Sequence, residues 1–435
     1  MLLTGYVPSQ FGIGLTFPIP KGKLGQKICS VEDFRGISVS PVVSKILEKA
    51  ILENFSSYLW SSDNQFGFKK KVGCSHAIYS LKSVIDHFVN NGSTVNLCSL
   101  DVSTAFDHVN HYAVFTKLME RHIPVCVVMM FRDWYSKCVG LVIWKGFLSA
   151  SFPLLAGVRQ GGCLSPVMFS ILINCLISSI VSSNLGCHVG ILNFGILMYA
   201  DDLVLLSASI HHLQLMINIC LNELFELDLS INAKKSVCVR FGRRFNSVCS
   251  SVCINGVNIP WSDSVKYLGI VFTSGHKLSY DFKPSRADFF RSFNSIFSKV
   301  YKANETVIVS LIKSKCIPVL MYGLEALDLN QSNLNKLDNP LYQVFGKIFK
   351  SFDKKILNNC MFYLDTLPLN AEYLFRKINF LRKMKAVPNS LLKHLSDEFG
   401  SIEIMKIYSS LQLEVVCSRE QFRRALWKRF QSSLV

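Results

Sequence analysis

The feature that most restricts the fold of this chain is a pair of adjacent aspartates at the end of a long uncharged stretch. No Asp, Glu, Lys or Arg occurs in the 41 residues from 160 to 200, and Asp201 and Asp202 follow directly. Apolar runs over 196–199 and 203–206 flank the pair, a pattern typical of a β-hairpin with carboxylates at its turn. Ionised carboxylates beside apolar strand residues are unfavourable unless a cation or a hydrogen-bond donor offsets them, so this pair needs such a partner.

A third aspartate, Asp101, is also flanked by apolar residues. Asp101 closes a run over 95–102 that predicts a buried strand. If this strand pairs beside the hairpin, Asp101, Asp201 and Asp202 converge at one sheet edge and can hold two divalent ions roughly 3.5–4 Å apart, an arrangement that serves phosphoryl transfer. Mg²⁺ suits such hard carboxylate oxygens. For any single aspartate the alternative is a turn residue or a cap at the end of a strand.

The uncharged stretch also has the composition of a membrane-spanning helix over 164–181. Polar residues recur through it, Pro166 suits a first helical turn, and the aspartates follow soon after. We therefore favour a buried core helix over a membrane span. The polar residues are Gln160, Ser165, Ser170, Asn174, Ser178 and Ser179.

The net charge indicates polyanionic partners. The 435 residues include 47 Lys and Arg against 30 Asp and Glu, a formal net charge of +17, which suggests nucleic acid or an anionic lipid surface. The 15 cysteines have no regular spacing, and the N-terminus lacks the pattern of a signal peptide. We expect free thiols in a reducing, intracellular compartment, nucleus or cytoplasm, with no signal peptide or transmembrane segment.

Helical and strand patterns alternate along the first part of the chain, so we expect a fold that contains both helices and strands. Predicted helices cover 42–59, 77–89 and 213–229, and further predicted strands cover 236–241 and 267–273. From residue 287 onward the pattern is mostly helical. Residues 346–435 carry 16 Lys and Arg against 8 Asp and Glu, which fits either a solvated helical face or a surface for a nucleic-acid backbone.

Eight short motifs follow one another along the first part of the chain. They are Thr16-Phe-Pro-Ile-Pro-Lys, Asp33-Phe-Arg-Gly-Ile-Ser, Gln65-Phe-Gly-Phe, Leu100-Asp-Val-Ser-Thr-Ala-Phe-Asp, Gly157-Val-Arg-Gln-Gly-Gly-Cys-Leu-Ser-Pro, Tyr199-Ala-Asp-Asp, Asn232-Ala-Lys-Lys-Ser and Tyr267-Leu-Gly-Ile. Each motif alone is weak. Together, in this order, they closely resemble the reverse transcriptase of non-LTR (LINE-type) retrotransposons over about residues 6–275.

The resemblance implies an α+β fold, that of a right-hand polymerase with an antiparallel palm sheet. Fingers and palm would occupy 1–282, the thumb 283–345, and a basic, mostly helical C-terminal region 346–435. The implied enzyme is an RNA-directed DNA polymerase, a nucleotidyltransferase that extends a primer 3′-hydroxyl with deoxynucleoside triphosphates by two-metal phosphoryl transfer. The implied partners are an RNA template, a DNA primer and two Mg²⁺ ions, with Mn²⁺ as the alternative metal, and no membrane.

The resemblance also assigns the reacting centre. Asp101, Asp201 and Asp202 match the catalytic, metal-binding triad of the palm. Lys21 and Arg35 match fingers residues that bind the incoming triphosphate, as a point charge and a bidentate fork would do. For both basic residues the alternative is an ordinary surface charge.

Further matches concern the nucleotide pocket. Phe106 matches the bulky residue beneath the sugar, where a ring excludes a 2′-hydroxyl. The alternative is a core aromatic, but the position of Phe106 five residues after Asp101 favours the role beneath the sugar. Gln160 and Gly161 match the turn that lines the nucleotide and template pocket, where glycines permit a close backbone approach.

The remaining matches concern the leaving group and the primer. Lys235 matches the lysine that assists the departing pyrophosphate as an acid, and a strand-edge charge is the alternative. The hairpin that grips the primer is matched by Tyr267, Leu268 and Gly269.

Two positions depart from the family pattern, since Arg159 stands where proline is usual and Gly162 where serine is usual. The chain also begins close to the first polymerase motif, so we expect a copy truncated of its endonuclease. Two alternatives to an active polymerase stay open. One is a catalytically inactive, truncated or repurposed RNA-binding protein with the same fold, and the other is a membrane protein built around 160–200. The sequence does not indicate the oligomeric state.

Overall fold

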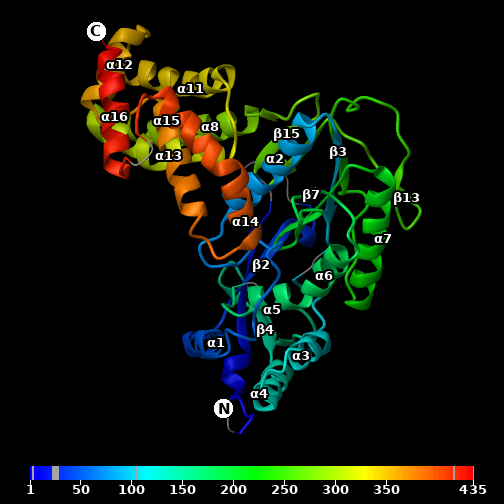
Figure 1. The fold of residues 1–435 in the computed structure, drawn as a ribbon. Helices are drawn as coiled ribbons and strands as arrows, with labels where there is room; N and C mark the ends of the chain where they lie inside the picture. The colour runs from blue at the N-terminus through cyan, green and yellow to red at the C-terminus, as the bar shows by residue number, and fades with distance from the viewer. Residues whose placement is uncertain (2–3, 22–28, 104–105, 160, 415–416, 435) are drawn as a thin grey trace. The chain divides into compact units, whose positions relative to one another are not determined.

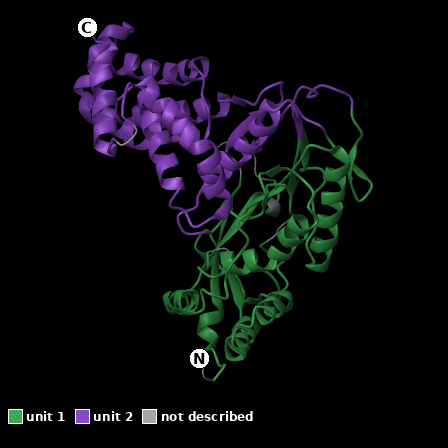
Figure 2. Ribbon diagram, viewed as in Figure 1, with its two compact units in different colours: residues 1–68, 96–238, 249–260 green, residues 69–95, 239–248, 261–435 purple. Residues whose placement is uncertain are grey.

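The computed structural model describes residues 1, 4–21, 29–103, 106–159, 161–414 and 417–434 (Figure 1). The chain forms two compact units that interleave along the sequence (Figure 2). Unit 1 contains residues 1–68, 96–238 and 249–260, and unit 2 contains residues 69–95, 239–248 and 261–435. The fingers, palm and thumb boundaries expected from the sequence stay a prediction, because compactness and function divide a chain by different criteria.

Unit 1 opens with a sheet that carries the first sequence motifs. β1 (Ile13–Pro20) pairs antiparallel with β2 (Phe34–Val39) and parallel with β4 (Val139–Trp144). Two short strands also pair with β4, namely β5 (Phe147–Leu148) and β6 (Phe152–Pro153).

The acidic hairpin lies in a second sheet, whose strand order is β11-β3-β10-β9. Its strands are β3 (Thr94–Asp101), β9 (Ile196–Tyr199), β10 (Asp202–Ser207) and β11 (Val237–Gly242). β10 is antiparallel to both β9 and β3, so the predicted hairpin and its pairing with the strand of Asp101 are confirmed. Unit 1 also contains the short pairs β7 (His188–Val189) with β8 (Leu192–Asn193), and β12 (Val252–Ile254) with β13 (Val257–Ile259).

The helices of unit 1 differ from the predicted ranges in three places, one of which is α7 (Ile210–Glu226), whose two ends each lie three residues before those of the predicted helix over 213–229. α1 (Val42–Asn54) stops short of residue 59, and the chain continues in turns in which Tyr58 N–H donates to Phe55 O and Leu59 N–H donates to Ser56 O. The predicted helix over 164–181 is two helices, α5 (Ser165–Leu172) and α6 (Asn174–Ser182). The other helices are η1 (Ser9–Gly12), η2 (Val31–Asp33), α3 (His111–Glu120) and α4 (Val125–Ser136).

The apolar pair α5 and α6 spans Ser165–Ser182, with a mean hydropathy of 1.8. Among the described residues it is the one helical stretch that length and composition would allow to cross a membrane, and 61% of it is buried inside the protein. At the junction of the two helices, the Asn174 side chain accepts a hydrogen bond from Ser62 N–H at 2.7 Å. Burial and this tertiary hydrogen bond favour a core element.

Unit 2 is mostly helical, as predicted from residue 287 onward. A three-stranded sheet in this unit joins β14 (Ser264–Tyr267), β15 (Ile270–Thr273) and β16 (Ser279–Asp281). The single strand predicted over 267–273 is therefore wrong. The chain reverses at Leu268 and Gly269, which both have positive φ, the geometry of a two-residue hairpin turn.

The helices of unit 2 begin with one from the first part of the chain, α2 (Cys74–Asn90). The others are α8 (Lys283–Val300), α9 (Glu305–Leu311), η3 (Ile312–Cys316), α10 (Ile317–Leu320), η4 (Leu324–Ala326), α11 (Gln331–Phe349), α12 (Lys354–Tyr363), α13 (Leu369–Met384), α14 (Ser390–Leu395), η5 (Ser396–Gly400), α15 (Ser401–Ser410) and α16 (Arg419–Ser432). η3 and η5 are π-helical turns, and η4 is a 3-10 turn.

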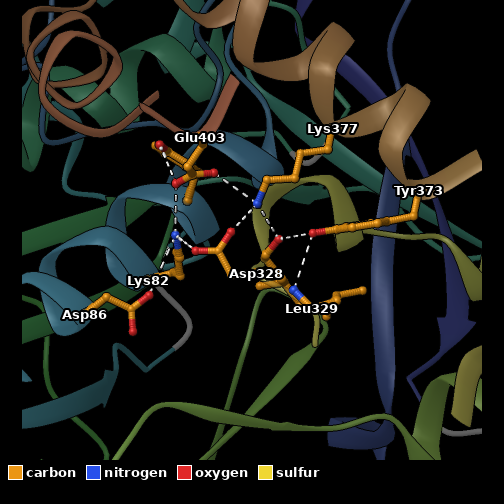
Figure 3. Close-up of polar contacts among 9 residues, drawn as sticks. Lys82, Asp86, Asp328, Leu329, Tyr373, Lys377 and Glu403 are labelled. Carbon is orange, nitrogen blue, oxygen red and sulfur yellow. Dashed lines mark hydrogen bonds and ion pairs between the residues drawn. The ribbon is translucent and has the colours of Figure 1, made fainter. Parts of the chain in front are cut away.

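A buried ion network joins α2 to the C-terminal helices (Figure 3). Lys82 on α2 pairs with Glu403 on α15 at 3.1 Å, and Lys377 on α13 pairs with the other Glu403 oxygen at 3.0 Å. Asp328 bridges both lysines, and Asp86 lies 3.6 Å from Lys82. The two lysine side chains are only 4% and 3% exposed, so their charges depend on these carboxylates.

The same network separates the pKa values of its two aspartates. Burial would raise the pKa of Asp328, but the Lys377 and Lys82 ammonium groups outweigh it and hold that pKa at about 2, below the ordinary 3.8. Burial raises the pKa of Asp86 to about 6, and the attraction of Lys82 opposes this rise only in part. Asp328 therefore stabilises the fold above about pH 4, whereas the charged form of Asp86 is unfavourable in the folded state.

We expect the Lys377→Met substitution to lower the free energy of unfolding by about 3–5 kcal/mol, because it leaves Asp328 and the largely buried Glu403 with Lys82 as their remaining cation in the network. Urea unfolding followed by circular dichroism measures the change. Lys385→Met is the matched control: Lys385 is 69% exposed and pairs with Asp397 at 4.0 Å, so its loss should cost under about 1 kcal/mol. Equal effects of the two substitutions would contradict a stabilising network.

We expect the Asp86→Asn variant to differ from the parent in a pH-dependent way. The folded pKa of Asp86 lies above its unfolded value, so the parent is penalised above about pH 6 and the penalty vanishes as the pH falls below about 4. The variant should be more stable by about 2–3 kcal/mol near pH 7 and equal to the parent near pH 4. Urea unfolding across this range measures the difference, and a constant difference would exclude titration of Asp86 as its source.

Candidate active site

The register of the second sheet aligns the predicted triad. Asp202 stands opposite Tyr199 in the hairpin and opposite Asp101 on the neighbouring strand. Asp201 precedes Asp202 in the turn, and Ala200, the residue before the pair, has a φ of 57°. Backbone pairing alone therefore brings all three carboxylates to one end of the sheet.

The electrostatics of this sheet end are those of crowded acids. Although Asp202 reaches solvent, the protein atoms around its carboxyl group shield it from water, and this shielding together with the Asp201 and Asp101 charges raises its pKa to about 6. The Arg35 guanidinium lowers the same pKa in part, which places Arg35 within electrostatic reach of the hairpin. A bound cation would stabilise the charged forms of such a group of carboxylates.

The segment 232–236 holds the end of β3 and supplies a lysine to the site. Asn232 N–H donates to Asp101 O at 2.8 Å, and Asp101 N–H donates to the Ser236 hydroxyl at 3.2 Å. Lys235 Nζ lies 3.8 Å from Asp101 Oδ2, with side chains that are 71% and 43% exposed. An exposed pair at this distance is weak, so Lys235 can exchange the carboxylate for another anion.

Phe106 lies in the same unit and is held by other aromatic rings. Its ring stacks on Phe169 of α5 with centroids 4.6 Å apart and meets the edge of Phe68 at 6.1 Å. Its carbonyl accepts a hydrogen bond from Val158 N–H at 2.8 Å. The ring is therefore fixed beside the glycine-rich turn that begins at Gly157.

That turn is packed too tightly for side chains. A Cβ on Gly157 would lie 2.7 Å from Asp107 O, and one on Gly161 would lie 2.3 Å from Ser38 O on β2. Both glycines have positive φ, 85° and 128°. Close backbone approach is thus observed at Gly161, whereas Gln160 lies outside the described residues.

Two polar side chains that secure this turn were not singled out as site residues from the sequence. Glu48 of α1, 4% exposed, accepts hydrogen bonds from Cys163 N–H and, at 3.1 Å, from Leu164 N–H, just before α5. Arg159 donates to Phe11 O at 3.1 Å and to Gly12 O at 2.9 Å. The sequence signal that points to Glu48 is a single acidic residue among the apolar residues of the predicted helix over 42–59.

Gln65 is a third residue to which the sequence alone assigns no role, although it begins the motif Gln65-Phe-Gly-Phe. It is fully buried, and its side-chain amide binds the backbone of Ala200. The fingers candidates are less clearly placed. Arg35 lies on β2 opposite Ile19, whereas Lys21 is exposed at the end of β1, and within the described residues no contact joins Lys21 to the acidic hairpin.

The predicted primer hairpin belongs to unit 2. Tyr267 is buried at the end of β14, and Leu268 and Gly269 form the turn with φ of 45° and 89°. A Cβ on Gly269 would lie 2.9 Å from the Tyr322 ring. A tight turn at these residues is therefore observed, while their contact with primer stays a prediction.

The donor set at the acidic hairpin fits a hard divalent cation. It consists of carboxylates, which Mg²⁺ and Mn²⁺ prefer, and their mutual repulsion is relieved by a bound cation. Among the described residues, no three His, Cys, Asp or Glu side chains already form a closed metal-binding cluster. The backbone register thus aligns the ligands, and binding would draw their side chains together.

Comparison with known proteins gives several relatives. The chain is 28% identical over 282 residues to the Retrovirus-related Pol polyprotein from type-2 retrotransposable element R2DM of Drosophila melanogaster, covering 63% of this chain and 26% of that protein. It is 23% identical over 423 residues to the RNA-directed DNA polymerase from mobile element jockey of the same species, covering 91% and 44%. The R2 polyprotein of Popillia japonica is 26% identical over 354 residues, covering 78% and 47%. The chain thus spans a quarter to a half of these relatives.

Among solved structures, apo telomerase from Candida tropicalis aligns with a TM-score of 0.47 and 14% identity, covering 96% of this chain and 69% of that one. The sequence profile described as "Reverse transcriptase (RNA-dependent DNA polymerase)" matches residues 19–272, more than half of the chain. That span contains the acidic hairpin, β3 and the glycine-rich turn. The resemblance to non-LTR retrotransposon enzymes and the expected α+β right-hand fold are confirmed, and the chain belongs to the reverse transcriptase family.

Proposed function

We propose that this chain is the RNA-directed DNA polymerase of a non-LTR retrotransposon, which extends a primer 3′-hydroxyl along an RNA template with deoxynucleoside triphosphates. The observation that carries the proposal is the direct pairing of Asp202 with Asp101 beside Asp201, inside the span that matches the family. A carboxylate triad of this kind is the ligand set of two-metal phosphoryl transfer.

The triad would hold two Mg²⁺ ions, or Mn²⁺, through Asp101, Asp201 and Asp202. When bound, such ions lower the pKa of the attacking hydroxyl and neutralise charge on the phosphates. The protein holds the carboxylates on a rigid sheet whose strands are buried, so their positions change little during the reaction. Lys235, 3.8 Å from Asp101, would donate a proton to the departing pyrophosphate.

Nucleotide selection would fall to the residues around the glycine-rich turn. Arg35 and Lys21 would bind the triphosphate, the first as a bidentate fork. Phe106 would lie under the sugar and exclude a 2′-hydroxyl, while Gln160 and Gly161 line the pocket. The packing of Phe106 on Phe169 supports a fixed position for that ring.

Template and primer would bind through the positive charge of the chain and through the unit 2 hairpin. A formal net charge of +17 favours a phosphate backbone in a salt-dependent way. Tyr267, Leu268 and Gly269 would contact the primer strand through the tight turn between β14 and β15.

We expect the parent chain to extend a DNA primer annealed to RNA with Mg²⁺, and Asp202→Asn to reduce the rate by about 10³-fold or more, because one metal ligand is lost. Single-nucleotide extension measures this, with Asp201→Asn as a second variant. Asp263→Asn removes an exposed acid outside the triad and should extend at the parental rate. If the parent binds the duplex in a salt-dependent way but adds no nucleotide, the inactive RNA-binding alternative is supported instead.

We expect Phe106→Val to admit ribonucleotides, because the smaller side chain leaves space for a 2′-hydroxyl. The ratio of kcat/KM for a deoxynucleotide to that for the ribonucleotide should fall by about 10–200-fold. Deoxynucleotide extension should persist, since the triad is intact. An unchanged ratio would mean that Phe106 acts only as a core aromatic against Phe169.

A further inference from the structure

The turn that carries the two aspartates is held from outside its own hairpin by the segment 64–67. Phe66 N–H donates to Met198 O at 2.8 Å, and Met198 N–H donates to Asn64 O at 2.9 Å, so the segment follows β9 in a short parallel bridge. Gln65 lies between these two bonds, and its side chain is fully buried. The backbone therefore fixes Gln65 beside the turn.

The side-chain amide of Gln65 satisfies both backbone groups of Ala200. Ala200 N–H donates to Gln65 Oε1 at 3.0 Å, and Gln65 Nε2 donates to Ala200 O at 3.2 Å. Oε1 also accepts a hydrogen bond from Gly67 N–H at 2.9 Å. A carboxamide offers a donor and an acceptor together, which neither a carboxylate nor an apolar side chain of this length can do.

Ala200 needs this support for two reasons. It lies beyond the last ladder pair of the hairpin, Tyr199 with Asp202, so strand pairing does not use its backbone groups. Its φ of 57° is also in the left-handed region, which is unfavourable for an L residue other than glycine. Without Gln65, buried backbone groups would be unpaired at a strained residue next to Asp201.

Gly67 acts on the same residue. A Cβ at Gly67 would lie 2.5 Å from Ala200 N and 3.1 Å from Gln65 Oε1, so only glycine allows the segment to lie this close. The segment thus contributes a side chain, Gln65, and a close backbone approach, Gly67, to one residue of the turn.

We infer that Gln65 is a positioning residue: by holding Ala200 it fixes the backbone from which Asp201 and Asp202 present their carboxylates. Gln65 does not itself touch the reacting atoms. The inference rests on the proposed function for its effect on catalysis, but its effect on the turn and on metal affinity is measurable without any reaction.

Two substitutions of similar length test the inference. Gln65→Met removes all three hydrogen bonds and keeps an apolar, buried side chain. Gln65→Glu keeps the acceptor but cannot donate to Ala200 O, and it serves if the methionine variant fails to fold. The matched control is Asn64→Leu, because the Asn64 amide is also buried and donates to Asn193 O at 3.1 Å and Ile196 O at 2.8 Å, away from the turn.

In the proposed polymerase, Gln65→Met should lower kcat for single-nucleotide addition by about 10–100-fold, since small misplacements of reacting groups have effects of this size. The KM for the nucleotide should stay within about threefold. Asn64→Leu should lose thermal stability but keep kcat. Equal losses of kcat in Gln65→Met and Asn64→Leu would show that Gln65 contributes only to the stability of the fold and would contradict a positioning role.

A rescue variant sharpens the test. Glycine adopts positive φ without strain, so Ala200→Gly in the Gln65→Met background should recover about fivefold in kcat by relieving the conformational part of the defect. No recovery would contradict a role through the Ala200 backbone.

Two measurements separate this inference from the proposed function. Hydrogen exchange at the Ala200 amide should be faster in Gln65→Met than in the parent or in Asn64→Leu, and Mn²⁺ affinity of the protein alone should fall about tenfold. Both results are expected even if the parent extends no primer, in which case only the proposed function fails. Unchanged exchange and unchanged Mn²⁺ affinity would overturn the inference.

Discussion

Repulsion between carboxylates is the constraint on which the architecture of unit 1 depends. Asp101 and Asp202 stand directly opposite each other on antiparallel strands, where like charges are unfavourable, and Asp201 adds a third. Both strands are otherwise almost wholly buried, so the sheet cannot relax by sliding without exposing apolar residues. The electrostatic cost is confined to the sheet end, where a cation can offset it.

Unit 2 also has charged side chains close to its core, but there the opposite charges pair with one another. Its carboxylates are matched internally by Lys82 and Lys377, whose side chains are almost completely buried. At the acidic hairpin, Lys235 is 71% exposed and only loosely paired with Asp101. A closed network stabilises a structure and leaves no place for a ligand, whereas an open group of acids with weak partners can receive one.

The local sequence pattern was sufficient to predict the hairpin and the strand of Asp101, because apolar runs that flank acidic residues are compatible with few backbone conformations. Contacts distant in sequence were not predictable. Gln65 reaches Ala200 across 135 residues, and Glu48 reaches Cys163 across 115, and neither contact leaves a periodic signal. The error over 267–273 has a local cause, since Leu268 gives no composition signal for the positive φ that it adopts.

Three polar side chains around the site share one mode of action, because each binds backbone groups that are distant in the sequence, although Arg159 also donates to Cys138 Sγ. Gln65 holds Ala200, Glu48 holds the N–H groups that precede α5, and Arg159 holds carbonyls of η1. A contact to backbone does not depend on which side chain the held residue carries. Substitutions at the held positions therefore leave these contacts in place, whereas loss of a holding residue leaves buried peptide groups unpaired. Arg159, which departs from the family pattern expected from the sequence, shows the same principle: it donates to backbone carbonyls of η1, while the N–H groups of Cys163 and Leu164 still donate to Glu48.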